Sequence, residues 1–179
     1  MTSDEHVLAT LVAEYRRLKT LGERALAQVP SDEAFNTFLD PESNSIVAIV
    51  RHLAGNMRSR WTDFLTTDGE KPTRNRDGEF DQTVRLTRDE VLAEWEQGWS
   101  VLLQSVEALT PADLQRTVTI RGEALTVFEA LTRAIIHAGQ HVGQILLLAK
   151  HLAGPAWQSL TIPRGQSTQG SWSYKQPGR

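Results

Sequence analysis

The sequence predicts an all-α protein: a four-helix up-and-down bundle with a short hairpin before the last helix. Four long segments repeat apolar residues in steps of three and four, the spacing of one helix face. Three of these segments follow a threonine that has a glutamate three residues later, the pattern of a helix-capping box. A chain of 179 residues with 40 % hydrophobic residues favours a single domain. We place it at residues 1–165 and expect a flexible tail at 166–179.

The first two helices are expected at about residues 4–29 and 45–65. The first follows the pair Thr2 and Glu5 and is stopped by Pro30. The apolar face of the second is formed by Ile46, Val50, Leu53, Met57, Trp61 and Phe64. His52 points away from that face, on a side with small residues that leaves room for another group.

The second half of the chain predicts two more helices and a hairpin. A helix at 87–109 carries two tryptophans that we assign to the core, and residues 116–126 alternate β-formers around an Arg-Gly turn. The last helix, about 127–152, is apolar almost all round and is therefore expected to be the most buried. Residues 68–86 form a long charged connection, which is either a functional loop or a solvent-exposed loop without a role in function.

Composition excludes several classes of function. There is no cysteine, so disulfides and thiolate sites are excluded and a metal site must rest on other side chains. The net charge of −3, with both signs mixed, gives no basic patch for nucleic acid. The apolar runs are far shorter than the roughly 20 residues that cross a bilayer. No leader sequence is visible, so we expect a cytoplasmic protein that does not bind membranes.

Three histidines are candidate metal ligands. His137 and His141 are four residues apart and so lie on one face of the last helix. His52 on the second helix offers a third imidazole. The alternative is that buried histidines are satisfied by hydrogen bonds, and a pair at this spacing also arises by chance. The zinc-protease motif is absent because Ala138 stands where that motif has glutamate.

Four neighbouring polar residues could assist such a site. Asn56, Gln140 and Gln144 could orient a ligand or a substrate, or could be packed polar residues. Arg133, one turn before His137, could hold an acidic substrate group or form a salt bridge at the rim. The sequence offers no clear general base.

Three segments resemble a known superfamily. Residues 44–56 resemble the second-helix ligand segment of the DinB/YfiT-like superfamily of metal-dependent enzymes, and residues 137–145 resemble its last-helix ligand segment. Residues 59–71 are similar to an uncharacterised bacterial branch. The resemblance implies a four-helix bundle, a divalent zinc or nickel ion held by His52, His137 and His141, and a homodimer. Its better-understood members include bacillithiol S-transferases and a mycothiol-dependent maleylpyruvate isomerase.

The function that we expect is therefore that of a metal-dependent enzyme acting on a small molecule. Three protein ligands leave a position open on zinc, as in catalytic sites. A hydrolase and a thiol S-transferase, the latter using a low-molecular-weight thiol, remain equal alternatives. A different class is a non-catalytic metal-binding or stress-response bundle that acts through partners.

Overall fold

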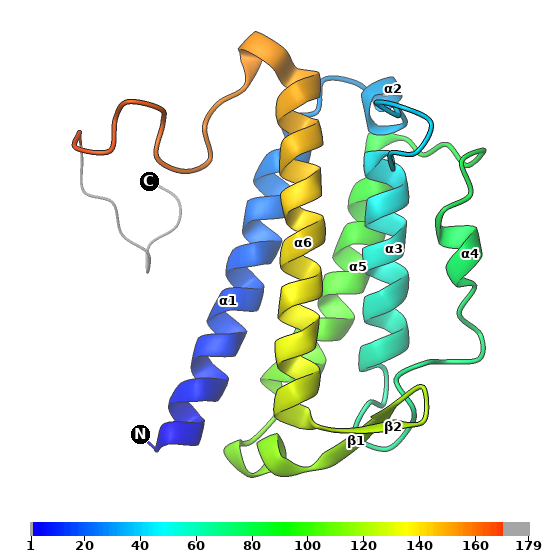
Figure 1. Ribbon diagram of the computed structural model, residues 1–179, viewed down its shortest axis with the longest axis vertical. Helices are drawn as coiled ribbons and strands as arrows, with labels where there is room; N and C mark the ends of the chain where they lie inside the picture. Colours follow the sequence, from blue (N-terminus) through cyan, green and yellow to red (C-terminus); the bar gives the residue numbers. More distant parts are fainter. Residues whose placement is uncertain (1, 170–179) are drawn as a thin grey trace.

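The computed structural model describes residues 2–169 and is mostly helical, as the all-α prediction requires. Four long helices lie side by side (Figure 1). They are α1 (Ser3–Leu26), α3 (Ile46–Trp61), α5 (Arg88–Glu107) and α6 (Val127–Ala153). The short elements are α2 (Asp32–Phe35), α4 (Arg76–Glu79), the 3-10 helices η1 (Pro111–Gln115) and η2 (Gly154–Ala156), and the strands β1 (Thr117–Ile120) and β2 (Glu123–Thr126).

The predicted capping boxes are present at the starts of α1, α5 and α6. At each start the threonine side chain accepts a hydrogen bond from the backbone N–H three residues on, and the glutamate there accepts one from the threonine N–H. The start of α3 is capped by Ser45, whose hydroxyl accepts a hydrogen bond from the backbone N–H of Ala48. These caps satisfy N–H groups that have no partner inside the helix.

The directions of the helices differ from a simple up-and-down order. The C-terminal ends of α3 and α5 lie side by side, where the Ser105 hydroxyl donates a hydrogen bond to the carbonyl of Trp61. The start of α5 meets the end of α1, where Arg88 donates to the carbonyl of Leu26. α3 and α5 therefore run in the same direction, and α1 and α6 run in the other (Figure 1). Parallel neighbours need a long return, and residues 62–87 supply it along the side of α3.

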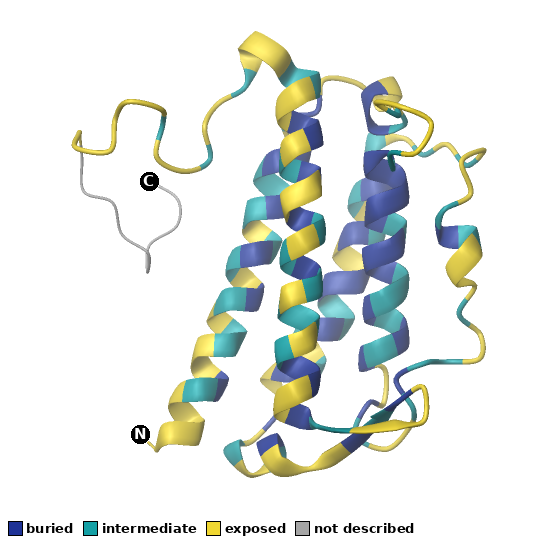
Figure 2. Ribbon diagram, viewed as in Figure 1, coloured by how far each residue is buried: buried dark blue, intermediate teal, exposed yellow. Residues whose placement is uncertain are grey.

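The prediction that the last helix is the most buried was wrong. Ile136 and Leu147 on α6 are 58 % and 67 % exposed, and Figure 2 shows exposed positions along that helix. On α3, by contrast, a run from Ile46 to Val50 is buried without interruption. α3 is covered by α5, α6 and the crossover of residues 62–87, whereas no helix or strand within residues 2–169 covers the outer face of α6.

The core is closely packed where α3 meets α5. A Cβ atom at Gly98 would lie 2.7 Å from the Cα of Ala54, so only glycine permits this approach of the two helices. Trp95 and Trp99 are buried, as predicted. The buried Tyr15 hydroxyl donates a 2.6 Å hydrogen bond to the carbonyl of Leu131 and so joins α1 to α6.

The predicted hairpin is present and lies at one end of the four long helices (Figure 1). β1 and β2 are antiparallel, with Thr117 opposite Thr126. The backbone N–H of Gly69 donates to the carbonyl of Thr119, which fixes the start of the crossover against β1. The Asp68 carboxylate accepts from the N–H groups of the hairpin turn at Arg121 and Gly122.

The ends of the described chain complete the fold. Trp157 and Leu160 are partly buried against the core, whereas Ile162 is 44 % exposed. The expected flexible tail at 166–179 lies outside the described residues from 170 onward. Within residues 2–169, none of the helices combines the length and apolar character that a bilayer crossing requires.

Candidate metal centre

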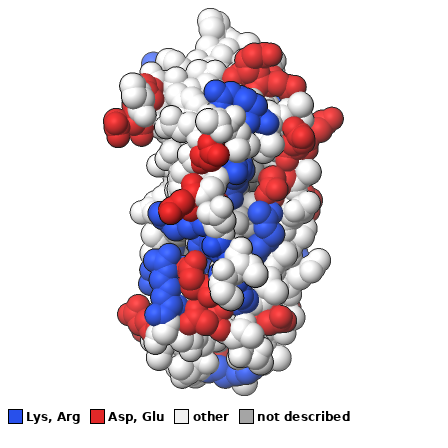
Figure 3. Space-filling model, turned by 90° about the vertical axis from the view of Figure 1, so that its right-hand side faces the viewer, with Lys and Arg blue, Asp and Glu red and all other residues white. Residues whose placement is uncertain are grey.

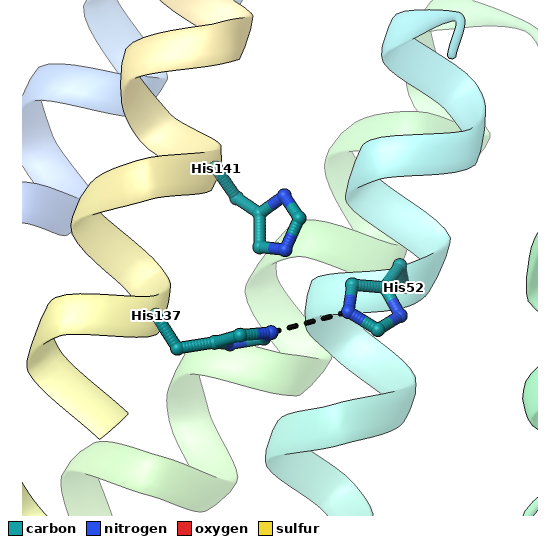
Figure 4. A group of neighbouring side chains, drawn as sticks. All are labelled: His52, His137 and His141. Atoms are coloured by element: carbon teal, nitrogen blue, oxygen red, sulfur yellow. Dashed lines mark hydrogen bonds between the residues drawn. The ribbon is translucent and has the colours of Figure 1, made fainter. Parts of the chain in front are cut away.

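The fold brings the three predicted histidines together between α3 and α6. His52 reaches from α3 toward His137 and His141, which lie one turn apart on α6 (Figure 4). The possible ligand atoms of the three rings all lie within 4.8 Å of one another. The Nε2 atoms of His52 and His137 are 3.2 Å apart.

These distances fit a divalent metal ion. Zinc binds imidazole nitrogen at about 2.0–2.1 Å in tetrahedral sites, which places two such nitrogens roughly 3.3 Å apart. The 3.2 Å between His52 and His137 agrees with that spacing. The widest separation, 4.8 Å, is larger than this spacing, so binding one ion with all three rings requires rotation of the half-buried His137 or His141 side chain.

His52 is the buried member of the group, and its ring is held on two sides. Its Nδ1 lies 2.9 Å from Oε2 of Glu79. An ionised carboxylate only accepts, so Nδ1 carries a proton, and Nε2 is the nitrogen that faces the other histidines. The ring of Phe80 packs beside it, with centroids 4.8 Å apart.

Glu79 is itself fixed by Arg74. The guanidinium donates two hydrogen bonds to the carboxylate, at 2.8 and 2.9 Å, and the Arg74 side chain is only 4 % exposed. Burial alone would raise the pKa of Glu79, but the hydrogen bonds from His52 and Arg74 outweigh it and hold that pKa below its ordinary value. Glu79 therefore stays ionised and keeps His52 in one tautomer.

The two α6 histidines are neutral at pH 7. Burial, the neighbouring His141 and His52, and the charges of Arg74 and Arg60 lower the pKa of His137 to about 4. Burial also lowers the pKa of His141, although its hydrogen bond with Gln144 partly opposes the shift. Neutral imidazoles are the form that binds metal.

The amide of Gln144 fixes the orientation of His141. Its Oε1 lies 2.8 Å from Nδ1 of His141 and accepts a hydrogen bond from that nitrogen. This leaves the Nε2 of His141 toward the cluster, as Figure 4 shows. Gln140 is exposed on α6 and does not line the cavity beside the histidines.

A pocket of about 180 Å³ opens beside His52 and His137. Asn56 and Arg133 line it, and both were proposed from the sequence as substrate contacts. Its apolar wall consists of Trp61, Phe64, Val118, Ile120, Ala130 and Ala134. The wall comes from α3, the crossover of residues 62–87, β1 and α6, so the hairpin forms one side of the candidate site.

The sequence did not single out Glu79, Phe80 or Arg74. They lie in the charged connection, where several other acids and bases have the same local pattern. One signal was present at Gly55, one turn from His52, since a Cβ there would overlap the Glu79 carboxylate. The room beside His52 that the small residues suggested is thus filled by the crossover.

Comparison with known proteins gives one family. The model of a family described as "Protein of unknown function (DUF1572)" matches residues 2–166. A search of curated proteins found no match.

Proposed function

This chain belongs to the DUF1572 family, which lies within the DinB/YfiT-like group, and on that premise we propose that it is a metal-dependent enzyme acting on a small molecule. We propose the same group's four-helix bundle as its fold type. The reaction is hydrolysis or transfer to a thiol, and the residues that would hold the metal are His52, His137 and His141.

One observation carries this proposal. Three imidazoles converge from two helices, and the most buried of them is oriented by an ionised carboxylate. A carboxylate or amide behind a histidine is the usual support of a metal ligand, because it fixes the tautomer and raises the basicity of the ring. Glu79 has this relation to His52 and Gln144 has it to His141.

Three protein ligands leave one position open, and a divalent ion held there would supply Lewis acidity that lowers the pKa of water or a thiol toward neutrality. Imidazole ligands suit both zinc and nickel. The open side of the cluster faces the pocket, where Asn56 can orient a substrate by hydrogen bonding.

Among the described residues, the pocket has no carboxylate that could act as a general base once the histidines hold a metal. No aspartate or glutamate is among its lining residues, and both oxygens of Glu79 are occupied by Arg74 and His52. A mechanism that needs little proton abstraction by the protein fits this environment. Attack by a low-molecular-weight thiol is one such reaction, and hydrolysis of an activated ester is the other.

Metal content is the first test. The purified wild-type chain should carry about one zinc or nickel ion per chain, and His137→Ala should lose it. His151→Ala is the matched control, because His151 is an exposed histidine in the last turn of the same helix and lies outside the cluster. Wild-type protein that takes up no zinc after zinc is added would contradict the proposal.

Activity is the second test. The zinc-loaded chain should turn over at least one substrate in a panel of thiols paired with electrophiles and of esters, and His137→Ala should not. Metal bound in stoichiometric amount, with no turnover across the panel, would favour the non-catalytic metal-binding protein that acts through partners.

A further inference from the structure

Five arginines line the pocket beside the histidines. They are Arg60, Arg74, Arg76, Arg121 and Arg133. They come from four parts of the fold: α3, the crossover of residues 62–87, the hairpin and α6. No carboxylate is among the residues that line the same pocket. The chain as a whole has a net charge of −3, so this concentration of positive charge is local.

Two carboxylates behind the wall balance part of this charge. Glu70 pairs with Arg60 at 2.9 Å and with Arg121 at 2.8 Å, and it also lies 3.7 Å from Arg74. Glu79 pairs with Arg74 and with His52. Three arginines therefore share two carboxylates, one of which also accepts from a histidine. These ion pairs hold the guanidinium groups in fixed positions at the pocket wall.

The other two arginines lack an acidic partner. Among residues 2–169, neither Arg76 nor Arg133 forms an ion pair, and both are exposed to solvent. Arg76 stacks over the ring of Phe80 at 5.4 Å. Arg133 lies one turn before His137 on α6, so its guanidinium can reach a group bound beside that histidine.

The arrangement is that of a binding site for an organic anion. Resting on the enzyme proposed above, we propose that its substrate carries a carboxylate or phosphate group. Arg133 and Arg76, the two pocket arginines without an acidic partner, bind this group while an apolar body lies on the wall formed by Trp61, Phe64 and Ile120. Guanidinium groups bind such oxyanions through two parallel hydrogen bonds. Asn56, whose amide has no hydrogen-bond partner among the described residues, supplies a further polar contact.

Charge in this position also steers substrate. Figure 3 shows the face that carries the crossover, where basic and acidic side chains are interspersed. The described residues that line the pocket, by contrast, include five arginines and no acid, and low-dielectric walls strengthen the field there. An anion that enters the pocket is therefore attracted toward the histidines.

The test compares anions with an uncharged analogue. Isothermal titration calorimetry of the zinc-loaded chain is carried out with benzoate, phenyl phosphate and benzamide. We expect at least one anion to bind at least tenfold more tightly than benzamide. Arg133→Gln should weaken that anion about tenfold, the effect of losing one charged hydrogen-bonding contact. The matched control is Arg16→Gln, an exposed arginine on α1 that pairs with Glu107 and should bind as wild type.

The two anions decide which oxyanion the site prefers. Tighter binding of benzoate assigns a carboxylate, and tighter binding of phenyl phosphate assigns a phosphate. Equal binding of benzamide and the anions, or unchanged anion binding in Arg133→Gln, would overturn the inference. The same titrations on His137→Ala distinguish failure of this inference from failure of the metal proposal. His137→Ala should still bind the anion more tightly than benzamide, even where no metal is bound. The double variant His137→Ala/Arg133→Gln should lose that preference.

Discussion

The two nitrogens of His52 have separate roles. Nδ1 donates to Glu79, and Nε2 faces the other histidines. The tautomer is therefore set by a carboxylate that arrives from a different part of the chain, 27 residues further on. Because Arg74 fixes that carboxylate in turn, the orientation of the ring depends on an ordered chain of three side chains.

Replacing this carboxylate should weaken the metal site. We expect Glu79→Gln to lower zinc affinity about 10- to 100-fold, the usual effect of removing a group that supports a metal ligand. The measurement is competition with a chromophoric chelator at a temperature where circular dichroism shows native helix content.

Glu94→Gln is the matched control for this variant. Glu94 also pairs with an arginine, Arg58, but neither residue lines the pocket that contains His52 and His137. Zinc affinity should stay at the wild-type value there. Equal affinity in Glu79→Gln and Glu94→Gln would mean that the hydrogen bond to His52 does not support metal binding.

The sequence singled out the three histidines and, beside them, Asn56, Gln144 and Arg133, but not Glu79, Phe80 or the other pocket arginines. His137 and His141 share a helix face by spacing alone, and the polarity of His52 on an apolar helix marked it as unusual. The other arginines and Glu79 could not be ranked in the same way. Their importance comes from how the crossover and hairpin fold back on α3, which is a matter of tertiary contacts and not of local pattern.

At the scale of elements, the contact between α3 and α5 depends on one glycine. Gly98→Ala should destabilise the protein, because the new Cβ would lie 2.7 Å from the backbone of Ala54 and force the helices apart. Alanine is favoured over glycine in helices by about 1 kcal/mol, but overpacking costs about 1–3 kcal/mol or more. We expect a net loss of about 1 kcal/mol in the free energy of unfolding, measured with urea.

Gln104→Ala on the same helix is the control for this loss. Gln104 is exposed, so the substitution should leave the unfolding free energy within about 0.5 kcal/mol of wild type. A Gly98→Ala variant more stable than wild type would show that the two helices can separate without cost.

Helix starts were predicted better than helix ends. The three threonine–glutamate boxes mark α1, α5 and α6 to within a residue, because capping is a local hydrogen-bond pattern. α3 stops at Trp61, whereas the apolar pattern continued to Phe64. Phe64 is buried, but it lies after the helix, against the ring of Trp61. Apolar periodicity reports burial, and burial continues past the end of a helix.

At the scale of the whole molecule, the crossover of residues 62–87 determines that α5 runs in the same direction as α3. Composition and periodicity predicted four helices but contain no information on direction. The length of the connection was the available signal, since antiparallel neighbours are usually joined by short loops. In the site, α3 faces α6, and His52 lies at the level of His137 and His141 on the opposing helix (Figure 4).

The exposed apolar face of α6 predicts association with a second copy. Ile136 and Leu147 are three turns apart on one side of the helix, and a Cβ at Gly139 or Gly143 would meet nothing within 4 Å. A second α6 can therefore approach closely in a two-fold arrangement. Light scattering after gel filtration should give twice the chain mass of 20.0 kDa.

Ile136→Gln/Leu147→Gln should convert this dimer to monomer. Leu39→Gln, which removes an exposed leucine away from α6, should leave it dimeric. A monomeric wild-type chain at micromolar concentration would contradict the prediction.

The helices and the crossover contribute different parts of the candidate site. The helices supply the three imidazoles, whereas residues 62–87 supply the carboxylate behind His52 and several of the charges that face the pocket. Surface connections tolerate insertion and exchange far better than packed helices. Relatives can therefore diverge in what they recognise by altering this segment, while the scaffold and its histidines stay the same.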